Sequence, residues 1–269
     1  MAQVLFKGTA WERSLEDYAY ATGLDRPGWA WEFLRLNPDY QRDFRINRAG
    51  KPTVIKHVSG ATHCRLRRRS LAAERWGLMM FSDPTKTSLE VGIHWQKDSI
   101  ARHVFCIAKP ANDNPKAVVS LSEFVGRRHL LVFGNHEHLC IQNGTISASL
   151  MIGGASLLVR DCELNFQIEG LDRLSSVTET LASLRRLKSK QPILPSTFGQ
   201  TELRLRECLV ALDGHLAGRS YRDIAEVLYG PERVKEVWTN ETRHLKDKVR
   251  RAVAAGIDYM NGGYLKLLQ

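Results

Sequence analysis

The sequence predicts an α+β protein with two domains. Apolar and aromatic residues recur at helical spacing in residues 11–47, apolar and polar residues alternate through much of 129–168, and helical spacing returns from Leu171 onward. The segment KPANDNP at 109–115 separates these patterns and has the composition of a boundary between compact units. We therefore expect a mostly helical N-terminal domain (1–109), a linker (110–116), and a C-terminal domain (117–269) in which a small antiparallel sheet precedes a helical unit.

The composition favours a cytoplasmic protein that binds a polyanion. The chain has 269 residues and a formal net charge of +10, and lysine and arginine gain free energy by displacing counterions from phosphates. No apolar stretch approaches the roughly 20 residues of a membrane-spanning helix, and the N-terminal MAQVLFKGTAWERS lacks the apolar core of a signal peptide. The cysteines are odd in number and never form a C-x-x-C pair, which indicates reduced thiols; they are Cys64, Cys106, Cys140, Cys162 and Cys208.

Residues 11–47 predict two helical pieces. Pro27-Gly28 separates them, and Asn37-Pro38 should bend or restart the second, because a residue before proline avoids the helical conformation. The aromatic residues at helical spacing either form a core or line a groove for a partner; they include Trp11, Tyr18, Trp29, Trp31, Phe33, Tyr40 and Phe44.

The rest of the expected N-terminal domain has weaker patterns. Residues 48–70 read as an irregular basic stretch whose closing arginines, Arg65 and Arg67 to Arg69, form either a solvated face or a set of phosphate contacts. We expect a short helix at 71–81, followed by extended segments at 91–95 and 104–108.

The alternating region predicts an antiparallel meander with one covered face. Segments at 129–133 and 138–142 flank the turn Gly134-Asn135, and Asn143-Gly144 introduces strict alternation from Ile146 to Ile152. Further segments at 157–160 and 162–168 continue the series.

Two helices should follow the sheet. The second spans 201–217, and the first spans 171–190 with cations at its C-terminal end, where they suit the helix dipole or could contact DNA. The apolar stripe of the first helix consists of Leu171, Leu174, Val177, Leu181, Leu184 and Leu187.

Residues 220–252 have the pattern of a helix-turn-helix. Ser220 and Asp223 form a variant of the capping box at the start of a short amphipathic helix, and Gly230-Pro231 should end it. A second helix should begin near Val234 and continue to Arg251, with a basic outer face. Its inward residues should be Val234, Trp238, Leu245 and Val249.

The basic second helix predicts a DNA contact. We expect Arg243, Lys246 and Arg250 to contact phosphates, whereas the side chains that can reach base edges are Lys235, Thr239 and Asn240. The alternative is a protein-interaction module, an adaptor or antiactivator, that keeps the helix-turn-helix shape with a solvated basic face.

Several motifs also resemble known regulators. SYRDIAEVLYG followed by a basic helix resembles the helix-turn-helix of bacterial sigma-factor region four. Residues from about 118 to 269, especially ALDGHLAGRSYRDIAEVLYGPERV, LKDKVRRAV and the ending GGYLKLL, resemble an uncharacterised C-terminal domain of alphaproteobacterial transcriptional regulators. WEFLRLNPDYQRDF and AAERWGLMMF resemble the short regulator-like domain that often precedes it.

The joined pair of domains is similar to the excision activators of rhizobial integrative and conjugative elements, which switch on an excisionase gene. This resemblance implies an activator of excision or transfer genes, with promoter DNA and RNA polymerase as partners, and with a small antiactivator related to the C-terminal domain as a further partner. A homodimer is also expected, because one recognition helix reads only a half-site. The basic stretch 48–69 departs from the family pattern.

Enzyme motifs are absent from the sequence, which contains no G-x-G-x-x-G, G-x-x-x-x-G-K-[ST], G-x-S-x-G or H-E-x-x-H. On one strand His136, His138 and Cys140 would share a face and could converge on zinc, or they could form the polar face of a hairpin. Asp161 and Glu163 could act as acid and base, but no pattern places them near a cleft. We expect no catalysis, no cofactor and no metal.

Overall fold

The computed structural model describes residues 13–47, 54–111, 118–189, 197–238 and 243–269. The chain divides into two compact units. The helical unit combines the described part of Met1–Arg42 with Thr197–Leu267, and the sheet unit consists of Asp43–Ser196 with Leu268–Gln269. This division differs from the expected boundary at 110–116, because the N-terminal helices pack with the C-terminal helices. Each unit is therefore built from segments far apart in the sequence.

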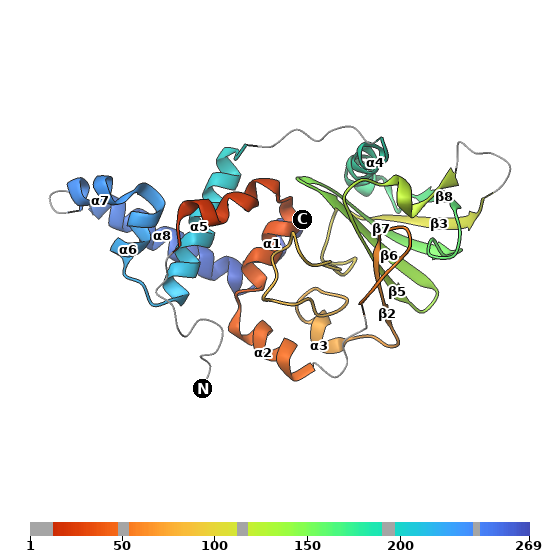
Figure 1. Ribbon diagram of the computed structural model, residues 1–269, viewed down its shortest axis with the longest axis horizontal. Coiled ribbons are helices and arrows are strands. Elements are labelled where there is room, and N and C mark those ends of the chain that lie inside the picture. Colours follow the sequence, from red (N-terminus) through yellow and green to blue (C-terminus); the bar gives the residue numbers. More distant parts are fainter. Residues whose placement is uncertain (1–12, 48–53, 112–117, 190–196, 239–242) are drawn as a thin grey trace. The chain divides into compact units, whose positions relative to one another are not determined.

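The helical unit is built around α5, which contacts η1, α1, α6 and α8. Asp25 caps α1 by accepting a hydrogen bond from Gly28 N, and Pro27 occupies the first turn, where its missing N–H costs nothing. The elements of this unit, coloured red to orange and cyan to blue in Figure 1, are η1 (Leu15–Gly23), α1 (Arg26–Leu34), the start of α2 (Pro38–Ile46), α5 (Gln200–Leu216), α6 (Tyr221–Tyr229), α7 (Pro231–Val237), α8 (Arg243–Met260) and all but the last residue of η5 (Gly263–Leu268).

The N-terminal aromatic residues belong to the core of the helical unit. Trp29, Trp31 and Tyr40 are fully buried, and the ring of Phe33 stacks on that of Tyr259 in α8 with centroids 4.7 Å apart. Of the two alternatives for these aromatics, core and partner groove, the structure places the described ones in a core, with Phe44 buried in the sheet unit. Trp11 lies outside the described residues.

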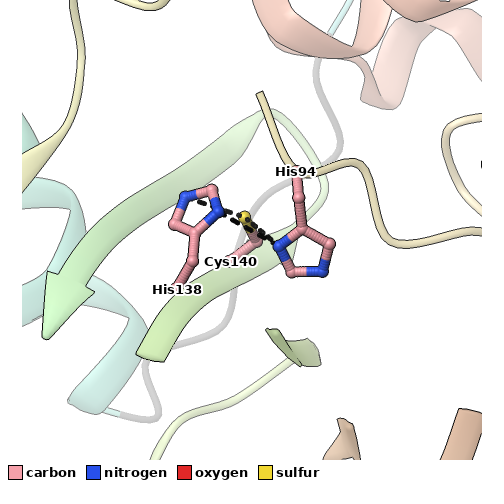
Figure 2. Close-up of side chains that lie close together, drawn as sticks. All are labelled: His94, His138 and Cys140. Carbon is pink, nitrogen blue, oxygen red and sulfur yellow. Dashed lines mark hydrogen bonds between the residues drawn. The ribbon is translucent and has the colours of Figure 1, made fainter. Parts of the chain in front are cut away.

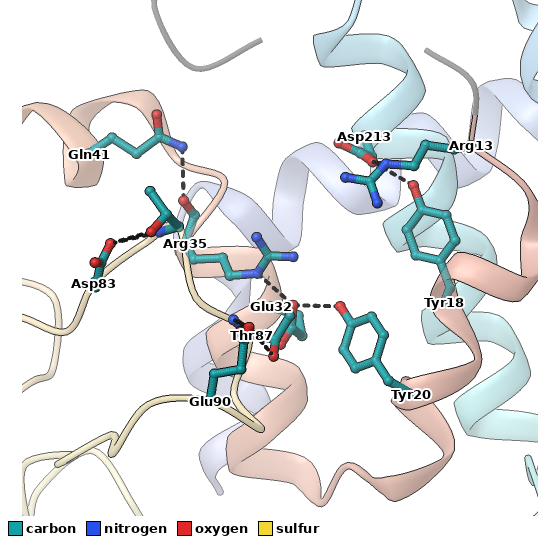
Figure 3. A network of polar contacts seen from close by, with 11 residues as sticks. Arg13, Tyr18, Tyr20, Glu32, Arg35, Gln41, Asp83, Thr87, Glu90 and Asp213 are labelled. Atoms are coloured by element: carbon teal, nitrogen blue, oxygen red, sulfur yellow. Dashed lines mark hydrogen bonds and ion pairs between the residues drawn. The ribbon is translucent and has the colours of Figure 1, made fainter. Parts of the chain in front are cut away.

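Polar contacts also stabilise the N-terminal part of the helical unit (Figure 3). The Tyr18 hydroxyl donates a hydrogen bond to Asp213 of α5. The carboxylate of Glu32, which is fully buried, accepts hydrogen bonds from Tyr20 at 2.8 Å and from Arg35 Nε at 2.6 Å. Burial acts to lower the pKa of Arg35, but the neighbouring Glu32 carboxylate outweighs it and raises that pKa, so the guanidinium stays charged.

The sheet unit contains one sheet of eight strands in the order β1-β2-β5-β6-β7-β3-β8-β4. Parallel pairing joins β2 to β5 and β3 to β7, and the other neighbours are antiparallel. The strands are β1 (Val54–Lys56), β2 (Thr62–Leu66), β3 (Val104–Pro110), β4 (Val118–Val119), β5 (Arg127–Phe133), β6 (His136–Asn143), β7 (Ile146–Gly154) and β8 (Cys162–Gln167).

The α+β class is confirmed, but the expected small antiparallel sheet was wrong. The meander β5–β6–β7 forms as expected, and β1, β2 and β3 from the first 110 residues extend it into a mixed sheet. The described part of residues 1–109 is therefore not mostly helical. Within 48–70, which we expected to be irregular, β2 buries Cys64 and Leu66 and exposes Arg65. The strand was not predicted because the arginines in and after it made the whole stretch read as a basic loop.

Different segments of the chain pack on the two faces of the sheet. On one face, α4 (Leu174–Lys188) packs through Val177, Leu184 and Leu187 against strand residues that include Leu139 and Leu150 (Figure 1). On the other face, Met80 of the segment 75–103 packs on Cys64, Leu66 and Leu131.

Several local expectations were wrong. The helix at 71–81 is only α3 (Leu71–Glu74), and positive φ at Gly77 accompanies the turn after it. Residues 91–95 form only the isolated bridge Leu78–Trp95, and 157–160 form a turn instead of a strand. The helix at 171–190 begins as η4 (Leu171–Arg173), and Leu171 is 86% exposed instead of inward. The short helix η3 (Leu121–Glu123) was not expected.

Candidate nucleic-acid interface

The first helix of the expected helix-turn-helix forms as the sequence indicated. Ser220 Oγ accepts a hydrogen bond from Asp223 N at 3.2 Å, and Asp223 Oδ2 accepts one from Ser220 N at 3.0 Å, which completes the capping box of α6. Ile224, Ala225 and Leu228 are buried on its inner face. Gly230, with φ of 88°, ends the helix.

The second helix differs from the expectation of one helix from Val234 to Arg251. The structure contains α7, which ends at Val237 and is followed by a turn at Trp238, and α8, which begins at Arg243. Thr239 and Asn240, two of the expected base-reading residues, lie outside the described residues.

The helix α8 is amphipathic and positions a basic face. Its inner face packs toward α5 and α6, and its buried residues include Leu245, Val249, Ala252 and Val253. Lys246, Arg250 and Arg251 are exposed. Lys246 and Arg250 are four residues apart, so they lie one turn apart on the same side of the helix. Residues 243–251 contain five cations and one acid.

One cation of α8 is turned inward instead. Lys248 Nζ donates a hydrogen bond to Glu207 of α5 at 2.9 Å and lies 4.7 Å from the centroid of the Tyr229 ring of α6. Partial burial acts to lower the pKa of Lys248, and the hydrogen bonds with Glu207 and Tyr229 outweigh it and raise that pKa. Lys248 therefore joins three helices and orients the exposed face of α8.

The one acid in this part of α8 leaves the basic face accessible. Asp247 pairs with Arg250 at 3.2 Å, and the two side chains are 45% and 65% exposed. Exposed ion pairs of this kind contribute only about 0–1 kcal/mol. A phosphate can therefore compete for Arg250 at little cost.

The helix α7 is a weaker candidate for phosphate contacts. Lys235 and Arg233 are exposed, but Glu232 and Glu236 are exposed on the same short helix and cancel their charge. Lys235 therefore lies on a neutral element, whereas Lys246 and Arg250 lie on a basic one. Arg243 is the first residue of α8, and the position of its side chain lies outside the described residues.

In each of two other basic features, one cation has a structural partner. At the end of α4, Lys188 Nζ donates a hydrogen bond to Val118 O at 3.0 Å and pairs with Glu123 at 3.3 Å. In the stretch 48–70, Arg69 forms an ion pair with Glu74. No helix in the described part of the chain is both long and apolar enough to span a bilayer.

The three residues that the sequence grouped as possible zinc ligands are not all brought together. His138 and Cys140 lie close to each other, but the third member of their cluster is His94. His136 is exposed at the start of β6. Sequence reasoning missed His94 because it lies in an irregular segment more than 40 residues away, with no spacing that links it to β6.

Two segments of the chain match family models. Residues 160–269 match one described as "T6SS, Transcription factor, DNA binding domain", and residues 11–80 match one described as "Proteobacterial transcriptional regulator-like domain". Comparison with curated proteins found no match. The chain is therefore a transcriptional regulator with a DNA-binding domain that contains α5 to α8. Each matched segment contributes residues to both compact units.

Proposed function

We propose that the chain activates transcription by binding promoter DNA through the exposed basic face of α8. The observation that carries this proposal is the exposure of Lys246, Arg250 and Arg251 on a helix whose opposite face is buried against α5 and α6. This helix lies within the segment that matches a DNA-binding domain.

Each residue has a distinct role in the proposal. Lys246 and Arg250, together with Arg243, bind phosphates, fix the register of the protein on the duplex and carry no sequence information. Base edges are read by residues that precede α8, namely Lys235 on α7 and the pair Thr239 and Asn240. Asn240 has the chemistry for bidentate hydrogen bonds to adenine in the major groove.

The salt dependence of DNA binding tests the proposal. Affinity of the full-length protein for a duplex of random sequence is measured by fluorescence anisotropy at several salt concentrations. Each phosphate contact contributes about 0.9 to the slope of log K against log salt, so Lys246→Ala should reduce the slope by about that amount. The matched control is Lys266→Ala, which removes one charge from an exposed lysine on η5.

Equal slopes for wild type and Lys246→Ala, with Lys266→Ala also unchanged, would contradict the assignment to α8. No binding at low salt would favour the adaptor or antiactivator alternative. The full chain is needed because a fragment that begins at 116 lacks α1, whose Trp29, Trp31 and Phe33 are buried in the helical unit.

Sequence preference tests the base-reading residues separately. Once an operator has been selected from a random library, Asn240→Ala should weaken operator binding by about 1–3 kcal/mol and leave nonspecific binding nearly unchanged. Lys246→Ala should weaken both. A reduction of both affinities by Asn240→Ala would place this residue among the phosphate contacts instead.

The proposal also names the genes that the protein regulates and its protein partners. Excision or transfer genes of an integrative and conjugative element are the targets that the sequence resemblance implies, whereas the matched family model is described with a T6SS transcription factor. Immunoprecipitation of protein-bound DNA from cells distinguishes these targets. RNA polymerase, a small antiactivator and a second copy of the chain are the proposed protein partners. Half-sites one helical turn apart in the recovered DNA would support the homodimer.

A further inference from the structure

The sheet face opposite α4 carries a cluster of metal-ligating side chains (Figure 2). His138 and Cys140 are two residues apart on β6, so they point to the same face. His94 reaches them from the segment 75–103, which covers this face. Among the described residues these three are the group of histidine, cysteine and acidic side chains whose ligand atoms all lie within 4.8 Å of one another.

Two of the separations are close to the edges of a tetrahedral coordination shell. With Zn–N bonds of about 2.05 Å and a Zn–S bond of about 2.3 Å, tetrahedral ligands lie about 3.3 Å apart for two nitrogens and about 3.6 Å apart for nitrogen and sulfur. His94 Nδ1 and His138 Nδ1 are 3.1 Å apart, and Cys140 Sγ is 3.8 Å from His94 Nδ1. Movements of a few tenths of an ångström would bring these two separations to coordination lengths. Cys140 Sγ lies 3.7 Å from His138 Nε2, and the three ligand atoms all lie within 4.8 Å of one another.

The surroundings leave both imidazoles suited to bind a cation. His94 and His138 are each 2% exposed, and a neutral imidazole offers one nitrogen lone pair to a metal ion. The second nitrogen of His138, Nε2, is 2.8 Å from Ser149 Oγ. Metal-bound histidines usually make such a hydrogen bond with the nitrogen that faces away from the metal.

We propose that His94, His138 and Cys140 bind one Zn²⁺ ion, with His94 Nδ1, His138 Nδ1 and Cys140 Sγ as ligands. Two imidazoles and a thiolate favour zinc over magnesium or calcium, which prefer oxygen ligands. Binding releases the thiol proton of Cys140 and replaces its hydrogen bond to Ile93 O, which measures 3.4 Å. Cys140 is half-buried, so water can occupy the fourth position.

The ion would act as a cross-link within the sheet unit. Apart from the bridge at Leu78 and Trp95, the segment 75–103 has no regular secondary structure. An ion bound by both His94 and the ligands on β6 would link this segment to the sheet. The proposal does not depend on DNA binding, because α8 belongs to the helical unit. Without metal, the same side chains form a hydrogen-bonded chain from His94 through His138 to Ser149.

Cobalt titration of the full-length protein separates these two states. Protein stripped with a chelator should bind one equivalent of Co²⁺ with the absorption of a tetrahedral site and a thiolate-to-cobalt charge-transfer band. Zn²⁺ should displace the cobalt. Cys140→Ser should abolish the charge-transfer band, and both Cys140→Ser and His94→Asn should weaken Zn²⁺ binding by more than about tenfold.

Matched controls lie in the same unit. His136→Asn changes an exposed histidine on the same strand, and Cys162→Ser changes a buried cysteine outside the cluster. Both should keep the band and the affinity. Zn²⁺ should also raise the melting temperature of the wild type more than that of Cys140→Ser, because a bound ion stabilises the folded protein in proportion to how tightly it binds.

Absence of stoichiometric binding, or a charge-transfer band that persists in Cys140→Ser, would overturn the proposal. An equal loss of affinity in His136→Asn would also overturn this ligand set. If His94→Asn does not fold, Cys140→Ser decides the outcome, because serine nearly preserves the volume of a half-buried cysteine.

Discussion

Replacing Asn37 tests whether the N-terminal segment is part of the helical unit. This residue is 5% exposed, and its Oδ1 accepts hydrogen bonds from Asp39 N at 2.8 Å and Tyr40 N at 3.1 Å, which caps the start of α2. Its Nδ2 donates to Met260 O at 3.0 Å and to Asn261 Oδ1 at 3.3 Å, at the end of α8. One side chain therefore stabilises two helix ends separated by more than 200 residues.

The expected cost of Asn37→Ala is the sum of two effects. Loss of an N-cap costs about 1 kcal/mol. A buried carbonyl left without its donor, here that of Met260, costs about 1–3 kcal/mol. The free energy of unfolding should therefore fall by about 2–4 kcal/mol, a large part of the roughly 5–15 kcal/mol typical of a domain. Asn37→Ser keeps an oxygen for the cap, so it should cost about 1 kcal/mol less.

Urea unfolding of the full-length protein, followed by far-ultraviolet circular dichroism, measures both variants. Because the chain has two compact units, the transition should be fitted with two steps, and the loss should appear in only one of them. A change below about 0.5 kcal/mol for Asn37→Ala, the size typical of a surface substitution, would refute the packing of the N-terminal segment on α8.

Two further substitutions test the support of the basic face. A Cβ added at Gly256 of α8 would lie 2.7 Å from Cys208 O and 2.9 Å from Leu212 Cβ of α5, so Gly256→Ala should destabilise the protein by about 1–3 kcal/mol in thermal or urea unfolding. A gain of about 1 kcal/mol, as expected from helix propensity alone, would show that α8 does not lie this close to α5. Ser220→Ala removes the N-cap of α6 and should lower the free energy of unfolding by about 1 kcal/mol in the same assay. Ser220→Thr keeps a hydroxyl for the cap and should lose much less stability. Equal stabilities of the alanine variant and the wild type would contradict the capping box.

The sequence by itself determined those elements whose signals are local. The capping box at Ser220 and Asp223 and the glycine at 230 specify the bounds of α6, because a capping hydrogen bond and a left-handed residue act within one turn. Alternation and the turns at Gly134 and Gly144 specify the meander, since each strand there pairs with its neighbour in sequence. The exposed positions of Lys246 and Arg250 also followed from helical period within α8.

Only the tertiary structure decided which distant segments meet. Nothing in the local pattern of residues 13–42 indicates that Asn37 reaches Met260, or that β2 pairs in parallel with β5. Helical period places Lys248 on the inner side of α8, three residues after Leu245, and only the tertiary structure supplies Glu207 of α5 and Tyr229 of α6 as its partners. His94 likewise joins β6 through chain folding alone. Local periodicity records which face of an element is buried, whereas the partner on that face depends on contacts between residues far apart in the chain.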